Sequence, residues 1–180
     1  TRRTALRSLG FGTALAVPRQ GIFRGTASVV SLGDAGVRER VLRPDLAQSV
    51  GFQRSFALGG MYPNSAMGTV ALMKQTLMDA EWYIRAWGAY ETSGRSLLPP
   101  ETSEALSALA KAVKGTQPVL FETTSEEEYL RAYKLAQDYK LTPWFRGSGQ
   151  EYRLIDVLKG RTQPLLLPLN FPDAPNVSSP

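Results

Sequence analysis

The side chains best placed for chemistry follow three short apolar runs in the second half of the chain. These runs begin at positions 118, 141 and 164, and the residues at their ends are Glu122, Thr123, Thr124, Arg146, Gly147, Ser148, Asn170 and Phe171. Earlier in the chain, Arg24 lies between Gly21 and Gly25, where its guanidinium could be presented to a carboxylate or a phosphate. The structural alternative is a tight turn in which Arg24 forms an internal ion pair.

The amino-acid composition excludes several kinds of active site. The chain has no histidine and no cysteine, so it cannot by itself build a Ser-His-Asp triad, a histidine metal site or a cysteine nucleophile. The net charge is +5, but no basic run exceeds two residues and no RNP-like or zinc-knuckle motif is present, so we expect no nucleic-acid partner. No apolar run is long enough for a membrane span, and no signal peptide is visible.

Helical patterns separate the three apolar runs and predict a β-α-β-α-β unit. The expected strands cover 118–122, 141–146 and 164–169. The first helix begins with the capping pattern Ser125-Glu-Glu-Glu128, and the second covers 151–158 with Tyr152, Ile155 and Leu158 on its apolar side. Strands that are apolar throughout are typical of a parallel sheet. A doubly wound sheet and a (β/α)8 barrel both fit, and both place functional residues where strands end.

The first half of the chain predicts further elements around a region that we could not place. We expect a helix to residue 9, strands at 13–17 and 27–32, and helices from about 64 to 90 and from 102 to 113; the region 37–60 is a weak strand-and-turn segment. On the long helix we expect the residues Met67, Val70, Ala71, Leu77, Met78, Trp82 and Trp87 to form the apolar face. Residues 1–180 are therefore interpreted as one incomplete α/β domain, truncated at both ends, with an irregular tail at 172–180.

Several segments resemble one enzyme family. The segments 12–19, 21–27, 29–34, 62–68 and 75–83, with the fairly specific stretches Tyr62-Pro-Asn-Ser65 and Leu167-Pro-Leu-Asn-Phe-Pro172, are similar to the middle of imidazolonepropionase-related proteins of the amidohydrolase superfamily. The similarity covers nearly all 180 residues. It implies a partial (β/α)8 barrel and metal-dependent hydrolysis of C–N bonds in cyclic amides or dipeptides. Histidine-poor relatives of this type tend to be exported bacterial proteins, which is compatible with a periplasmic location.

The resemblance also implies where a metal would be bound. Active members hold one or two divalent metal ions with histidines, and the positions of the fifth-strand and sixth-strand histidines correspond here to Glu122 and to Arg146 or Gly147. Glu122 could still ligate zinc in the complete protein, whereas arginine cannot ligate a cation. Alternatively, Glu122 and Arg146 pair with each other where the metal was, or Glu122 caps the following helix with Thr123 and Thr124. This segment alone is expected to hold no metal.

Two functions follow from the resemblance. In the first, the chain is part of the wall of an amidohydrolase-like barrel, and the metal ligands lie elsewhere in the complete protein. Arg24, Arg146 and Asn170 then contact a substrate carboxylate or carbonyl, and the catalytic residues are unassigned. In the second, the barrel is inactive and serves as a binding or packing domain. The expected partners are the remainder of the barrel and a small amide or peptide. An unrelated phosphate-binding module would need a glycine-rich phosphate loop, and only Gly147-Ser-Gly149 resembles an anion site.

Overall fold

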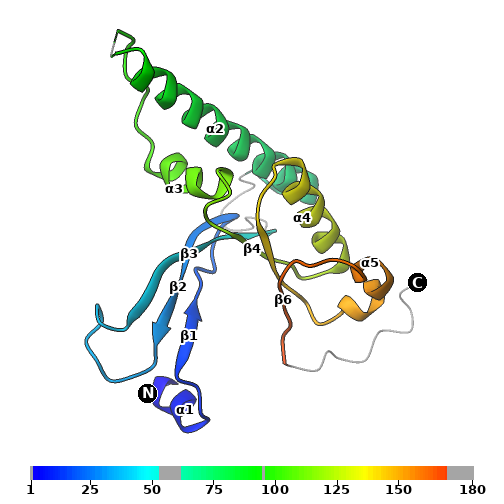
Figure 1. Ribbon diagram of the computed structural model, residues 1–180. Helices are drawn as coiled ribbons and strands as arrows, with labels where there is room; N and C mark the ends of the chain where they lie inside the picture. The colour runs from blue at the N-terminus through cyan, green and yellow to red at the C-terminus, as the bar shows by residue number, and fades with distance from the viewer. Residues whose placement is uncertain (1, 53–61, 95, 170–180) are drawn as a thin grey trace.

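The computed structural model describes residues 2–52, 62–94 and 96–169, and it shows a six-stranded sheet with its main helices against one face (Figure 1). In chain order the elements are α1 (Arg2–Ser8), β1 (Thr13–Ala16), β2 (Phe23–Ser31), β3 (Val41–Gly51), α2 (Ala66–Thr92), α3 (Glu104–Val113), β4 (Val119–Glu122), α4 (Glu126–Asp138), β5 (Pro143–Arg146), the 3-10 turn η1 (Glu151–Leu154), α5 (Ile155–Leu158) and β6 (Leu165–Leu166). Within these described ranges, no helix combines the length and the hydropathy needed to cross a membrane.

The strand order identifies the architecture. The six strands lie side by side in chain order, β1 to β6. A doubly wound sheet reverses its strand order at a switch point, whereas a barrel adds each strand beside the previous one. The sheet is therefore a curled half-barrel, and the predicted partial barrel is confirmed. Strands β3 to β6 pair in parallel, but β1, β2 and β3 pair antiparallel, so the parallel pairing expected from the later strands holds only from β3 onward.

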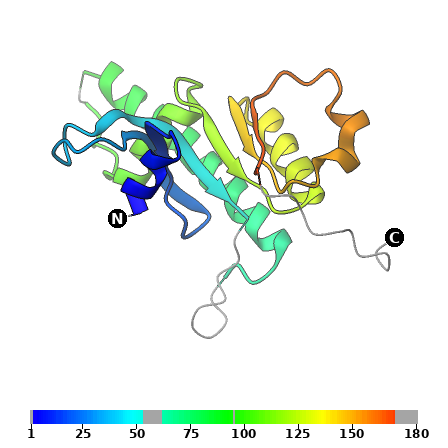
Figure 2. The same cartoon turned by 90° about the horizontal axis from the view of Figure 1, so that it is seen from below.

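The hydrophobic core lies between the sheet and the helices α2, α3 and α4, which Figure 2 shows behind the strands. Phe121 of β4 and Phe145 of β5 stack there with their ring centroids 5.9 Å apart, and Tyr129 of α4 packs on Phe145 at 4.6 Å. The neighbouring residues Leu120 and Trp144 point to the opposite face, because side chains alternate along a strand. We call that opposite, helix-free side the inner face of the half-barrel.

The predicted starts of α2, α3 and α4 are confirmed, and a serine caps each of these three helices. The side chains of Ser65, Ser103 and Ser125 accept hydrogen bonds from backbone N–H groups in the first turns of α2, α3 and α4. The predicted apolar face of α2 was partly wrong, since Met67, Ala71, Met78 and Trp82 are exposed. The residues of α2 that are buried are Thr69, Met73, Leu77, Ala80 and Tyr83. Met73, Leu77 and Ala80 of this stripe belong to the hydrophobic core, and the partly buried Val70 and Leu72 pack against it.

Four segments differ from the expected elements. Strand β2 begins at Phe23, before the expected 27–32, so Arg24 lies in a strand and not in the tight turn considered for it. The unplaced region contains β3, whose first half is exposed and carries Arg43 and Asp45 while residues 47–51 are buried, which hid the strand pattern. The helix expected at 151–158 is only η1 followed by one turn of α5, and Tyr152 and Ile155 are exposed. Strand β6 has two residues instead of the expected 164–169. Asn170, Phe171 and the predicted tail lie outside the described residues.

Candidate functional site at the strand ends

Glu122 lies in a row of residues at the carboxyl ends of the parallel strands. In the strand register, Gly51 of β3 is opposite Glu122 of β4, Glu122 is opposite Arg146 of β5, and Arg146 is opposite Leu166 of β6. Since Phe121 and Phe145 face the helices, the alternation of side chains places Glu122 and Arg146 on the inner face. This is the edge where α/β barrels carry their binding and catalytic groups.

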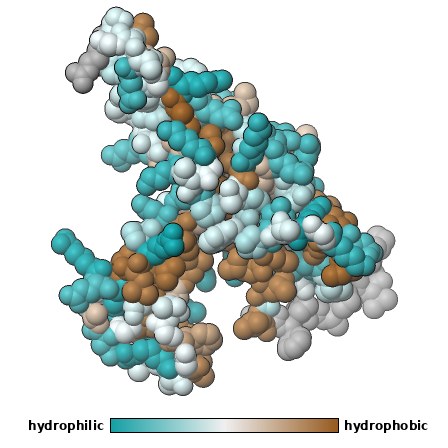
Figure 3. All heavy atoms as spheres, in the orientation of Figure 1, coloured by the Kyte–Doolittle hydropathy of each residue, from teal (hydrophilic) through white to brown (hydrophobic). Residues whose placement is uncertain are grey.

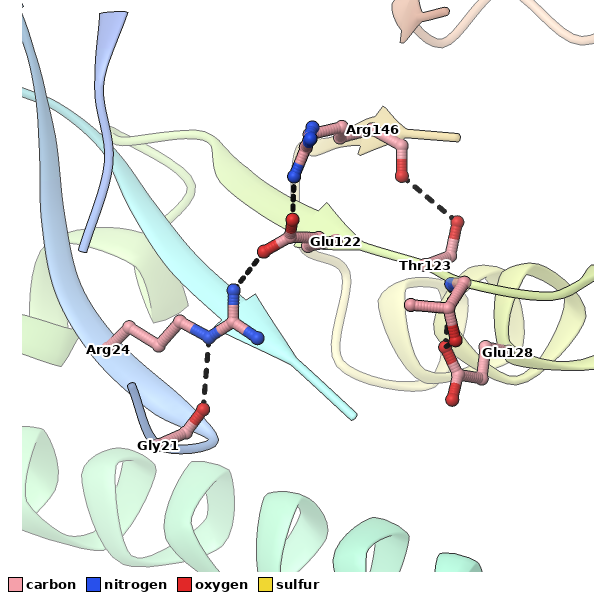
Figure 4. A network of polar contacts seen from close by, with 7 residues as sticks. Gly21, Arg24, Glu122, Thr123, Glu128 and Arg146 are labelled. Carbon is pink, nitrogen blue, oxygen red and sulfur yellow. Dashed lines mark hydrogen bonds and ion pairs between the residues drawn. The ribbon is translucent and has the colours of Figure 1, made fainter. Parts of the chain in front are cut away.

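Two arginines hold the carboxylate of Glu122 from opposite sides (Figure 4). Nη1 of Arg24 donates to Oε2, and Nη1 of Arg146 forms an ion pair with Oε1. The Nε of Arg24 also donates to the carbonyl of Gly21 at 3.0 Å. The exposed fractions of the three side chains are 7% for Arg24, 23% for Glu122 and 52% for Arg146. We call this arrangement the Arg24–Glu122–Arg146 bridge.

Gly51 makes room for the buried arm of the bridge. A Cβ atom at position 51 would lie 2.2 Å from Nη2 of Arg24, so only glycine lets Arg24 of β2 pass over β3 and reach β4. Burial lowers the pKa of the Arg24 guanidinium from its usual value, but arginine titrates so far above neutral pH that the group stays charged. Its charge is balanced by Glu122, as a buried charge requires.

The two threonines after Glu122 have structural partners. Oγ1 and the backbone N of Thr123 both donate to the carbonyl of Arg146, at 3.1 and 3.0 Å, which fixes the end of β5 beside β4. The backbone N and Oγ1 of Thr124 both donate to Oε2 of Glu128 at 2.8 Å. The side chains of Ser125 and Glu128 therefore accept the hydrogen bonds of backbone N–H groups at the start of α4, and Glu122 takes no part in capping that helix.

The glycine-rich segment after β5 is already filled by a carboxylate of this chain. Oε1 of Glu151 accepts from the backbone N of Ser148 at 2.5 Å, and Oε2 accepts from the backbone N of Gly149 at 2.8 Å. Glu151 is 7% exposed, and a Cβ at Gly147 would lie 2.3 Å from its Oε1. The predicted anion site at 147–149 thus binds its own Glu151, and it offers no free N–H cluster to an external anion.

A cavity of about 390 Å3 opens beside the bridge. It is lined by Arg19, Arg24, Phe52, Glu122, Thr124, Glu128 and Arg146. A second cavity of about 330 Å3 lies on the inner face and is lined by Leu15, Val17, Arg19, Leu120, Glu122, Arg146 and Leu166. The structure brings the predicted Arg24, Glu122 and Arg146 together, and it adds Arg19, which the sequence analysis missed. The signal for Arg19 was its place just after the apolar strand at 13–17.

A divalent metal does not fit at Glu122 in this arrangement. Both carboxylate oxygens already form ion pairs with guanidinium groups, and two positive charges within ion-pair distance would repel a cation. Among the described residues, no three His, Cys, Asp or Glu side chains cluster closely enough to hold a metal. The residues present suit an anion or a polar neutral ligand better than a cation.

Comparisons with known proteins support the fold. The crystal structure of an amidohydrolase from Thermotoga maritima MSB8 superposes with a TM-score of 0.80 at 15% sequence identity. The match covers 89% of this chain and 43% of that protein, so the chain spans less than half the length of its structural neighbour. No protein-family model matches the chain, and no curated protein matches it.

Proposed function

We propose that this chain forms part of an amidohydrolase-like barrel whose strand ends bind a small molecule. In this proposal Glu122 forms ion pairs with two arginines and does not ligate a metal. The observation that carries the proposal is that both oxygens of Glu122 are engaged by arginines from two other strands. Any metal-dependent hydrolysis of cyclic amides or dipeptides then depends on ligands outside the described residues. The binding step uses the strand-end cavity.

Membership of the amidohydrolase superfamily is supported by two independent similarities. One is the likeness in fold to the Thermotoga maritima protein, and the other is the set of sequence segments similar to imidazolonepropionase-related proteins, including Tyr62-Pro-Asn-Ser65. The imidazolonepropionase-related branch rests on the second alone. The second candidate function, a barrel without chemistry that binds or packs, is favoured by the same ion bridge, because it leaves Glu122 no free oxygen for a metal.

We also propose that the inner face packs against the remainder of the barrel. Figure 3 shows hydrophobic side chains on both sides of a hollow in the lower half of the molecule. The apolar residues on this face are Leu15, Val17, Ala27, Ala47, Leu120 and Trp144. Barrel interiors are filled by layers of such side chains from all the strands, and the structural neighbour is more than twice as long as the matched region. This makes the rest of a barrel the best-fitting partner for the inner face.

The metal content of the complete protein tests the proposal. We expect zinc stoichiometry, measured by elemental analysis after purification without chelator, to be the same in the wild type and in Glu122→Ala, whatever its value. Glu127→Ala, on the exposed side of α4, is the matched control, and circular dichroism checks that each variant is folded. A loss of zinc that is confined to Glu122→Ala would make Glu122 a metal ligand and would overturn the proposal.

Hydrolase assays separate the two candidate functions. If the complete protein hydrolyses cyclic amides or dipeptides, and Glu122→Gln retains the metal, the barrel is an enzyme whose metal ligands lie elsewhere. No turnover of either substrate class in the zinc-supplemented protein supports the binding or packing barrel. Restoring a histidine with Glu122→His is expected to leave metal content unchanged, because Arg146 still occupies the neighbouring strand end.

A further inference from the structure

The strand-end cavity contains guanidinium groups with donors to spare. Arg146 uses Nη1 for Glu122, its side chain is half exposed, and no other hydrogen bond of that side chain occurs within the described residues. Arg19 lines both cavities, and in the described part of the chain it has neither an ion pair nor a side-chain hydrogen bond. Each guanidinium has five N–H donors in a planar fork. Both arginines can therefore donate to a ligand while the bridge stays intact.

The charges around the cavity favour an anion. The lining contains three arginines (Arg19, Arg24, Arg146) and two glutamates (Glu122, Glu128), so its net charge is +1. Glu122 is shared by two arginines, and Oε2 of Glu128 accepts from Thr124. Most carboxylate oxygens of the lining therefore already have hydrogen-bond or ion-pair partners, whereas N–H donors of Arg19 and Arg146 remain available. A positive surplus in a partly enclosed site attracts an anion more strongly than it would in open water.

The same features favour a carboxylate over a phosphate. An arginine fork matches both groups, but a phosphate dianion carries twice the surplus charge of the cavity. Phosphate sites also rely on clusters of backbone N–H groups, and the cluster at 147–149 is taken by Glu151. Apolar surface lies beside the two arginines, because the adjoining inner-face cavity is also lined by Arg19 and Arg146 and by the side chains of Leu15, Val17, Leu120 and Leu166.

We propose that the strand-end cavity binds a small monocarboxylate with an apolar or aromatic body, through Arg19 and Arg146. The buried Arg24 and Glu122 hold Arg146 in place and do not contact the carboxylate. This proposal rests on the proposed function, because it assumes that the strand ends form the binding site, and it adds the chemical class of the ligand. It assigns a role to Arg19. At the strand ends, where the family resemblance implied a metal ion, it places a pair of arginines that binds an anion.

Calorimetric titration of the complete protein with benzoate tests this site. We expect saturable binding of benzoate and at least about tenfold weaker binding of its neutral analogue benzamide, because a hydrogen-bonded charge typically contributes a factor of ten or more. Raising the salt concentration is expected to weaken benzoate binding. Absence of saturable benzoate binding, equal affinity for benzamide, or tighter binding of inorganic phosphate would each overturn the assignment.

Variants locate the site. We expect Arg146→Gln to weaken benzoate binding about tenfold or more and Arg19→Gln to weaken it severalfold, while Arg131→Gln on the exposed side of α4 leaves it unchanged. Arg146→Lys keeps the charge and the ion pair but loses the fork, so it should fold normally and bind benzoate with intermediate affinity. Binding that is unaffected by changes at both 19 and 146 would place the ligand elsewhere. Zinc content is measured on the same samples, so failure of benzoate binding is distinguishable from a metal ligand role of Glu122.

Discussion

Glu122 and Glu151 are two carboxylates near the ends of neighbouring parallel strands, and the chain neutralises them in different ways. Glu122 is held by side chains of Arg24 and Arg146, which come from two other strands. Glu151 is held by backbone N–H groups of Ser148 and Gly149, within three residues of itself. The first carboxylate joins distant parts of the sheet beside an open cavity, and the second closes its own loop.

The difference separates the two sites by function. Backbone donors cannot be redirected without moving the loop, so the Glu151 site is a closed structural unit. The guanidinium groups at Glu122 have further donors, and Arg146 is half exposed, so this site can accept a ligand without losing its internal contacts. Carboxylates at strand ends are therefore best distinguished by whether their partners are side chains with spare donors or backbone groups without them.

The largest effect is expected from Glu122→Ala, which removes both ion pairs and leaves the buried Arg24 without a counter-charge. We expect a loss of about 3 kcal/mol in the free energy of unfolding, at the low end of the range for a broken buried pair, because Glu122 is partly exposed. Urea denaturation measures the loss. The exposed pair of Glu127 and Arg131 is the comparison, and Glu127→Ala should cost less than about 1 kcal/mol.

A double replacement sharpens this prediction. Arg24→Leu together with Glu122→Leu removes both charges of the pair, and we expect it to be less destabilising than Glu122→Ala, because most of the cost of the single change comes from the unpaired, buried charge of Arg24. If the double variant were as unstable as the sum of the two single variants, the two residues would not be coupled and the bridge would be unimportant for stability.

The next largest effect is expected from Gly51→Ala. The new Cβ would overlap the Arg24 guanidinium at 2.2 Å, so the arginine must leave Glu122 or the strands must move apart. We expect a loss of about 2 kcal/mol in unfolding free energy, as for other overpacked sites. Gly88→Ala in α2 is the control, because nothing lies within 4 Å of its added Cβ, and alanine there should stabilise the helix by up to about 1 kcal/mol. A neutral Gly51→Ala would contradict the placement of Arg24.

Local sequence patterns predicted much of the fold. Features that depend on contacts between residues far apart in the sequence were predicted less well. The strands around Phe121 and Phe145 and the serine caps follow from neighbouring residues, so the sequence predicted them. Strand β3 was missed because its exposed half carries Arg43 and Asp45, which interrupt the apolar pattern. The boundaries of α5 and β6 were too generous, since short apolar runs fix an element's presence better than its length.

The candidate site was predictable only in part, for the same reason. The pairing of Glu122 with Arg146 could be suggested because both residues end parallel strands that were expected to be neighbours. The contact of Arg24 with Glu122 joins residues 98 positions apart, and it depends on the missing side chain of Gly51. No local pattern encodes such a contact, and the same holds for Arg19, which reaches the cavity from the loop after β1.

A smaller, local effect is expected at the second carboxylate. Glu151→Ala leaves the N–H groups of Ser148 and Gly149 without their acceptor, and we expect a loss of about 1 to 2 kcal/mol. Amide hydrogen exchange should accelerate at residues 148 and 149 more than in β4. Asp156→Ala, in a pair that is exposed nearby, is the control and should change neither. Faster exchange in β4 as well would contradict the distinction between the closed loop at Glu151 and the Arg24–Glu122–Arg146 bridge across the sheet.

The smallest effect is expected at Asp34, whose exposed carboxylate marks the other extreme from Glu122. The hydrogen bond from Arg7 at 2.5 Å, aided by the charges of Arg7 and Arg3, holds the pKa of Asp34 below its ordinary value. A carboxyl group whose pKa is lower in the folded state stabilises the fold above its unfolded-state pKa of about 4 and loses that contribution as the pH falls through the folded-state pKa. We therefore expect a slight loss of stability in this acidic window for the wild type, which Asp34→Asn abolishes. Following the Asp34 carboxyl by NMR, Arg7→Gln should return its pKa toward the ordinary value. An unchanged pKa in Arg7→Gln would show that solvent screens this pair completely, unlike the pairs around Glu122.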